Sequence, residues 1–217
     1  KLKMETGEVE QAGQLAAHAV SVWEAAEAAG YEEADVATLV ESLTRLAEAC
    51  EVLDRSVAAE AAYERALERL EYMLGPDHPE VAEHLGKMGG AYMAHCEWEK
   101  AEFCYCRALA FAHRFTGPCS LHISHFYNVL AELHRARGDT SQAQALYQRA
   151  LQVIERVLGT NHPEVATYLN NLAETLRARG RLQDAEPMYV RALAIDESTQ
   201  GVSHPIVAIR LNNLAEL

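Results

Sequence analysis

The residues best suited to bind a metal ion are ten histidines and five cysteines. His122 and His125 lie three residues apart and could share one face of a helix, with Cys119 close to them in sequence. A zinc site needs three or four ligands, and no acidic or thiolate residue completes the set in this register. We therefore expect no metal ion and no other cofactor.

Catalytic motifs are also missing from the sequence. We find no nucleophile–base pair, no glycine-rich phosphate loop and no His-Glu-x-x-His segment. His78, His162 and His204 each precede a proline in a turn, where we expect them to bond the local backbone. Cys104 takes a core position in the repeat described below, and Cys106 an exposed one. The sequence thus predicts a protein that is not an enzyme.

Composition and charge exclude further classes. The net charge of −13 argues against binding to nucleic acid, which needs a basic surface. No run of 18 apolar residues is present, so we expect no membrane insertion. Five cysteines at irregular spacing favour a reducing, cytoplasmic location. The charge is uneven, because residues 1–90 carry 19 acidic and 7 basic side chains, whereas residues 91–217 carry 13 and 12.

An internal repeat is the strongest signal in the chain. One glycine recurs every 42 residues, and three of the four copies open a Gly-x-x-His-Pro phrase, whereas the Gly117 copy has Ser120 and Leu121 in the last two places. Alanine, tyrosine and arginine keep the same period further along. The recurring residues are Gly75, Gly117, Gly159 and Gly201; Tyr63, Tyr105, Tyr147 and Tyr189; Arg65, Arg107, Arg149 and Arg191; and Ala66, Ala108, Ala150 and Ala192.

Each repeat is predicted to fold as two helices. Apolar residues recur at helical spacing after Pro163, and Gly180 ends that helix as Gly138 ends its counterpart one repeat earlier, with Cys96 in the same place before them. Gly201 is expected to end the second helix in a left-handed conformation. Stacked hairpins bury faces that one hairpin cannot, so we predict an all-α fold, a right-handed α-solenoid of helix-turn-helix units. The expected array is a single helix over 8–29, full repeats over 31–74, 75–116, 117–158 and 159–200, and a half repeat over 201–217.

The repeat resembles the tetratricopeptide repeat (TPR), in the 42-residue variety found in kinesin light chains. The segments that carry the resemblance are Leu158-Gly159-Thr-Asn-His162-Pro163-Glu-Val165-Ala166 and Leu169-Asn170-Asn171-Leu172-Ala173. It implies a scaffold or adaptor that binds a peptide or partner helix in a concave groove lined by the first helix of each repeat. In a kinesin light chain this would be cargo recognition. The groove residues predicted from it are Lys87, Asn128, Glu132, Arg135, Thr167, Asn170, Asn171, Glu174, Arg177, Asn212 and Asn213.

Two local alternatives remain open. The row Asn128, Asn170 and Asn212 could clamp a peptide backbone, or each side chain could bond a neighbouring helix. The acidic N-terminal part could be a solvated face, or it could pair with basic groups of a ligand. A carboxylate ligand is not expected there, because Glu48 would repel it.

The function has alternatives of its own. The chain could be the sensor or regulatory domain of a larger signalling protein, such as a nucleotide-switch ATPase. Self-association is a further alternative, because the last half repeat leaves Leu211 and Leu214 without a hairpin partner.

Overall fold

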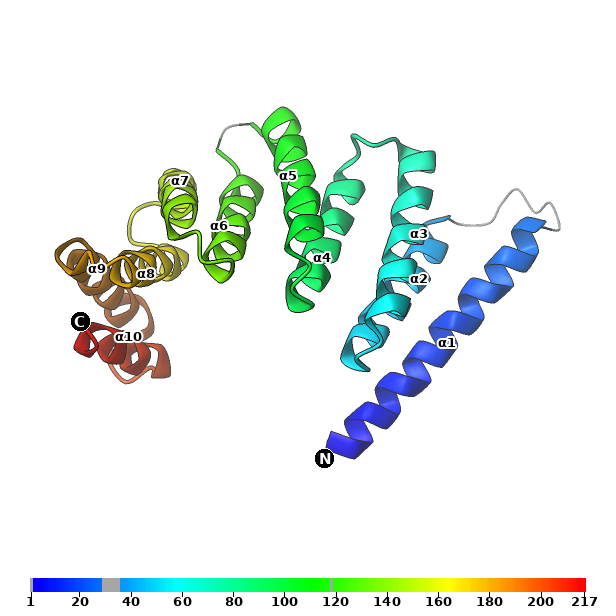
Figure 1. Ribbon diagram of the computed structural model, residues 1–217, viewed down its shortest axis with the longest axis horizontal. Helices are drawn as coiled ribbons and strands as arrows, with labels where there is room; N and C mark the ends of the chain where they lie inside the picture. Colours follow the sequence, from blue (N-terminus) through cyan, green and yellow to red (C-terminus); the bar gives the residue numbers. More distant parts are fainter. Residues whose placement is uncertain (1, 29–35, 118) are drawn as a thin grey trace. The chain divides into compact units, whose positions relative to one another are not determined.

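The computed structural model describes residues 2–28, 36–117 and 119–217 of the chain. These residues form helices joined by short turns, and they contain no β-strand (Figure 1). The predicted end of the single helix at residue 29 and the predicted start of the first repeat at residue 31 lie outside the described residues. The helices are α1 (Leu2–Ala28), α2 (Val36–Val52), α3 (Ser56–Leu74), α4 (Pro79–Ala94), α5 (Trp98–Phe115), α6 (Leu121–Ala136), α7 (Thr140–Leu158), α8 (Pro163–Ala178), α9 (Leu182–Gln200) and α10 (Pro205–Ala215).

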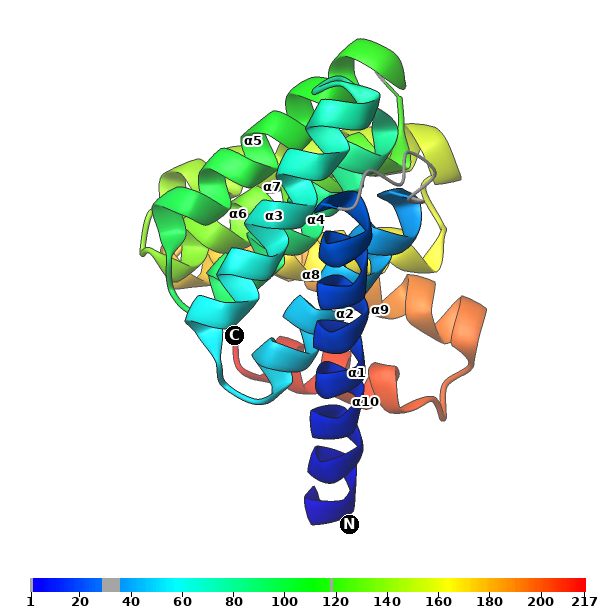
Figure 2. The same cartoon turned by 90° about the vertical axis from the view of Figure 1, so that its right-hand side faces the viewer.

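The contacts divide the chain into two compact bodies, with the division inside α5 between Cys104 and Tyr105. We call them the N-terminal body and the C-terminal body and describe each by itself. Within each body, helices that are consecutive in sequence pack against each other, as the two views in Figures 1 and 2 show for α1–α4 and for α6–α10.

The recurring histidines bond the local backbone, as predicted, and by doing so they cap the first helices. The Nδ1 atoms of His78, His162 and His204 each accept a hydrogen bond from the backbone N–H two residues later, at 3.3, 3.2 and 3.3 Å. In the degenerate repeat, the Ser120 hydroxyl oxygen accepts the equivalent bond from the His122 backbone at 3.2 Å. The lost histidine is therefore replaced by another residue that can cap a helix.

Gly201 and the equivalent glycines that follow the other second helices have a positive φ, as expected for Gly201, but they do not have the ψ of the left-handed helical conformation. Gly75, Gly159 and Gly201 have φ of 85, 85 and 89° and ψ of 158, 161 and 149°. This region of backbone space is essentially open to glycine alone, because a side chain would clash there. The requirement for glycine is thus stricter than a left-handed helix cap would impose.

A second set of positive φ angles lies in the turns inside the hairpins. Gly138 and Gly180 have φ of 85 and 72°, and the equivalent positions in the two earlier repeats are Asp54 and Cys96, with φ of 57 and 60°. The turn therefore keeps its conformation even where the residue has a side chain. In a residue other than glycine, the positive φ brings the side chain into a steric clash with the backbone.

The C-terminal body has a continuous core of small and aromatic residues. Ala150 and Ala192 have no exposed surface and lie in one buried cluster, Tyr147 and Tyr189 are buried in a second, and Leu151 and Met188 pack against both. A buried ion pair also joins α9 to α10, because Arg210 Nε donates to Asp196 Oδ2 at 2.8 Å. The N-terminal body has a smaller cluster, made of Val20, Leu39, Leu43 and Ala66.

The effect of the positive φ at Cys96 on stability can be tested by substitution. Cys96→Gly should raise the free energy of unfolding by about 1 kcal/mol, because glycine adopts the positive φ without strain. Urea denaturation followed by circular dichroism measures the change. The reciprocal variant Gly180→Cys is the control and should lower stability by a similar amount. A destabilised Cys96→Gly protein would show that the cysteine side chain contributes more than its backbone strain costs.

Candidate functional site

The predicted groove residues of the C-terminal body lie on its first helices, α6, α8 and α10. They repeat as an asparagine, a glutamate four residues later and an arginine three residues after that. This spacing places the three side chains along one face of each helix. The sets are Asn128, Glu132 and Arg135 on α6; Asn170, Glu174 and Arg177 on α8; and Asn212 on α10 with Glu216 directly after the helix.

Within each helix the asparagine bonds the glutamate. Asn128 Nδ2 donates to Glu132 Oε1 at 2.8 Å, and Asn170 Nδ2 donates to Glu174 Oε1 at 2.7 Å. Asn212 repeats the bond to Glu216 at 2.9 Å. Each carboxylate therefore holds one asparagine amide in a fixed orientation, with the amide oxygen left to accept another bond.

A second set of bonds joins one repeat to the next. Asn171 Nδ2 donates to Asn128 Oδ1 at 3.2 Å, and Asn213 Nδ2 donates to Asn170 Oδ1 at 2.8 Å. The adjacent asparagines of each repeat thus have different roles, because the second of the pair donates to the first of the preceding repeat. These bonds connect α6 to α8 and α8 to α10. We call the bonded side chains, Asn128, Asn171, Asn170 and Asn213, the asparagine row.

The side chains of the asparagine row make hydrogen bonds to other groups of the protein. Asn170 is only 5% exposed, and both its oxygen and its nitrogen have protein partners. The bond to a neighbouring helix, which the sequence left as an alternative, is therefore present. Contact between Asn170 and a ligand remains a prediction. The more accessible predicted groove residues in this body are Thr167, Arg135 and Asn212, whose side chains are exposed.

Three carboxylates and two guanidinium groups lie around this row. Arg177 Nη1 lies 3.3 Å from Glu216 Oε2, so an ion pair also joins α8 to α10. The charge of Arg135 interacts with Glu174 and Glu132. Tyr147 lies beside these groups, and its burial raises its pKa to about 12, so it stays a neutral hydroxyl. This surface therefore presents amides and paired charges rather than a strong field of one sign.

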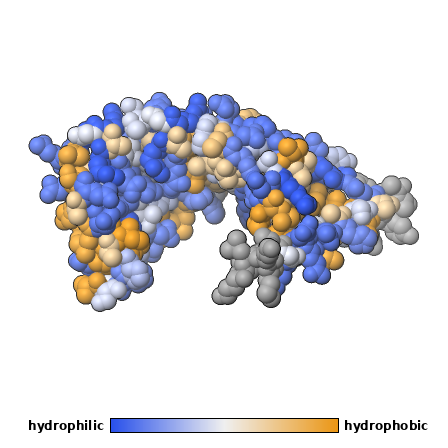
Figure 3. Space-filling model, turned by 60° about the horizontal axis from the view of Figure 1, so that its bottom comes forward, coloured by the Kyte–Doolittle hydropathy of each residue, from blue (hydrophilic) through white to orange (hydrophobic). Residues whose placement is uncertain are grey.

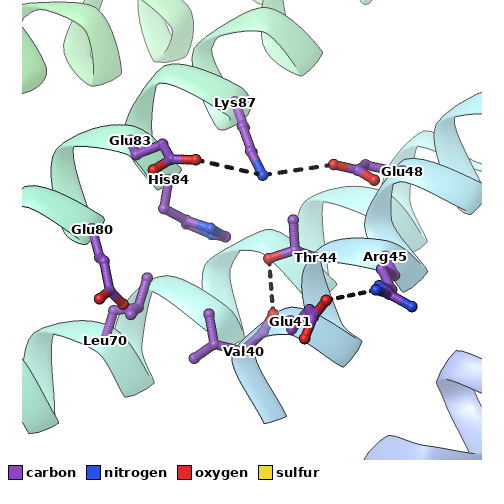
Figure 4. Close-up of a pocket in the computed structure, with 10 residues that line it drawn as sticks. All are labelled: Val40, Glu41, Thr44, Arg45, Glu48, Leu70, Glu80, Glu83, His84 and Lys87. Carbon is purple, nitrogen blue, oxygen red and sulfur yellow. Dashed lines mark hydrogen bonds and ion pairs between the residues drawn. The ribbon is translucent and has the colours of Figure 1, made fainter. Parts of the chain in front are cut away.

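The remaining predicted groove residue, Lys87, lies on α4 in the N-terminal body. Its Nζ atom is 3.9 Å from Glu48 Oε1 and 4.0 Å from Glu83 Oε1 (Figure 4). These residues line a pocket of about 370 Å³ between α2, α3 and α4. This pocket was not predicted from the sequence, since it forms only where α2, α3 and α4 pack together.

Comparison with known proteins places this arrangement in a family. The tetratricopeptide repeat model matches residues 35–113, 122–198 and 170–217. The chain is a tetratricopeptide repeat protein. This confirms the family and the all-α solenoid fold class predicted from the sequence, and TPR domains are typically protein-interaction modules. No curated protein sequence matches the chain.

Solved structures share this fold, and some of them are described as kinesin light chain repeats. BtubC (BKLC) from P. vanneervenii has a TM-score of 0.77 at 26% identity, over 94% of this chain and 79% of that one. A Podosopora anserina protein with kinesin light chain nearly identical TPR-like repeats has a TM-score of 0.68 at 20% identity, over 92% and 96%. MamA is more distant, with a TM-score of 0.56 at 15% identity, over 84% and 89%.

Among residues 2–28, 36–117 and 119–217, no group of three or more histidine, cysteine, aspartate or glutamate side chains could hold a metal ion. Within the same ranges, no helix is long and apolar enough to cross a membrane. The space-filling view shows a face that is mostly hydrophilic, with its hydrophobic residues in separate patches (Figure 3).

The bonds between repeats generate a prediction about coupling. A double-mutant cycle on Asn170→Ala and Asn213→Ala should give a coupling energy of about 1 kcal/mol, because each variant removes one partner of the same bond. Thermal or urea unfolding of the four proteins measures it. The control cycle pairs Asn170→Ala with Thr167→Ala, whose exposed side chain shares no bond with Asn170, and should be additive. Additivity in both cycles would mean that the Asn213–Asn170 bond contributes nothing in solution.

Proposed function

We propose that this chain is a non-catalytic interaction module whose first helices in the C-terminal body hold a peptide or helix of a partner protein. The observation that carries the proposal is that asparagine, glutamate and arginine occupy equivalent positions on α6 and α8, and that the asparagine and glutamate recur at Asn212 and Glu216. A polypeptide ligand also presents equivalent groups at regular intervals along its backbone. A surface that repeats one set of donors and acceptors suits such a ligand better than a compact small molecule.

The chemistry of this surface supports recognition through hydrogen bonds. The asparagine row is held in place by its own bonds, so a ligand would meet amide groups that are already oriented, and binding would cost less ordering of side chains. Asn212 is exposed and has one protein bond, to Glu216, which leaves its oxygen and a second amide hydrogen available. The resemblance of the repeats to those of kinesin light chains supports, within this proposal, the role of a cargo adaptor.

The proposal can be tested with a peptide selected by phage display against the full chain. Thr167→Glu should weaken the selected peptide at least tenfold, because it adds a charge and bulk to the exposed first-helix surface beside Asn170. Fluorescence anisotropy measures the affinity.

The matched control is Gln152→Glu, which makes the same charge addition at an exposed position of the second helix α7. It should leave the affinity unchanged, and both variants should keep the melting temperature of the parent. If Gln152→Glu weakens binding and Thr167→Glu does not, the peptide lies on the second helices and the proposal is wrong.

A further inference from the structure

The pocket around Lys87 in the N-terminal body is separate from the peptide surface proposed above. It has a volume of about 370 Å³ and lies between the first helices α2 and α4, with the end of α3 closing one side. Figure 4 shows the side chains arranged around this space. The lining residues are Val40, Glu41, Thr44, Arg45, Glu48, Leu70, Glu80, Glu83, His84 and Lys87.

Carboxylates outnumber cations in this lining. Arg45 is paired with Glu41 at 2.6 Å in the same helix. Lys87 is shared between Glu48 and Glu83 at distances near the limit for an ion pair. The Glu80 carboxylate, the fourth in the pocket, has no bonding partner among the residues that the structure describes. The two basic residues are thus already paired, and four carboxylates leave an excess of negative charge and of hydrogen-bond acceptors.

A buried histidine adds an unpartnered acceptor that is independent of these carboxylates. His84 is only 4% exposed, and its ring extends from α4 toward Thr44 (Figure 4). Its Nε2 atom donates to the Tyr63 carbonyl oxygen at 2.8 Å, so the proton is on Nε2 and Nδ1 carries a lone pair. In the described part of the chain, Nδ1 has no partner. Burial lowers the pKa of His84 and so favours the neutral ring, which keeps this acceptor at neutral pH.

Thr44 also presents hydrogen-bond acceptors and no free donor to the pocket. It is 7% exposed, and its hydroxyl donates to the Val40 carbonyl oxygen at 2.8 Å, so only its lone pairs remain free. Two nearly buried polar side chains therefore line the pocket with acceptors and without free donors. A bound group that supplies several N–H donors would satisfy both of them.

We propose that this pocket binds a basic side chain of a partner polypeptide, and that arginine fits it best. A guanidinium group offers five N–H donors in a planar fork, which matches acceptors that converge from two helices. Val40 and Leu70 provide an apolar wall for the methylene stem of the side chain. The site lies wholly in the N-terminal body and does not depend on the peptide surface proposed for the C-terminal body.

The test is an NMR titration of the full isotope-labelled chain with acetyl-Ser-Arg-Ser-amide. The expected result is saturable shifts of the Thr44, Leu70 and His84 backbone amides, which weaken as salt is raised. The control peptide contains citrulline, which has nearly the shape of arginine without its charge, and it should bind at least fivefold more weakly. Equal binding of both peptides, or no shift with the arginine peptide at 10 mM, would overturn the proposal.

A pair of variants shows whether the carboxylates of the pocket are responsible. Glu80→Gln with Glu83→Gln should weaken the arginine peptide roughly fivefold, because two exposed charge contacts are lost. The matched variant, Glu64→Gln with Glu68→Gln, makes the same change in net charge on exposed positions of α3 outside the pocket lining. Equal weakening by both pairs would assign the effect to the general charge of the body and would contradict a specific site. Thr167→Glu, in the other body, should leave this binding unchanged.

Discussion

Close approach of helices is the constraint on which the rest of this structure depends. A single amphipathic hairpin cannot bury both of its apolar faces, so each repeat needs its neighbours. The alanines at 66, 108, 150 and 192 have no exposed surface in the structure, and they occupy the same place in each repeat. A larger side chain at such a position would have to push two helices apart. The 42-residue period therefore follows from a packing requirement that recurs once per hairpin.

The polar surface of the C-terminal body is built on that packing. Because the hairpins stack at a constant repeat, the asparagine of one first helix meets the second asparagine of the next at hydrogen-bond distance. The glutamate one turn along orients the same amide from within its own helix. The surface that we propose for ligand binding and the bonds between repeats therefore involve the same row of residues, of which Asn170 is buried and Asn212 is exposed.

Much of the fold could be predicted from the sequence, because the period aligns residues with strong local preferences. The histidines before proline were expected to bond the local backbone, and Gly138 and Gly180 were expected to end a helix; both expectations hold in the structure. The period alone could not reveal that Asn170 is buried between two partners, since equivalent positions in a repeat share a face but not a degree of exposure. The pocket beside His84 was missed for a similar reason. It requires side chains from three helices, and the bond from His84 to Tyr63 spans 21 residues.

The central claim is that the asparagine row is oriented before any ligand binds. The most direct test is the exchange of side-chain amide protons with water, measured by NMR in the free protein. The account predicts slow exchange at Asn170, which is buried and bonded on both sides, and fast exchange at Asn212, which is exposed. Exchange at Asn170 as fast as at Asn212 would show that the row is not formed in solution, and it would contradict the account.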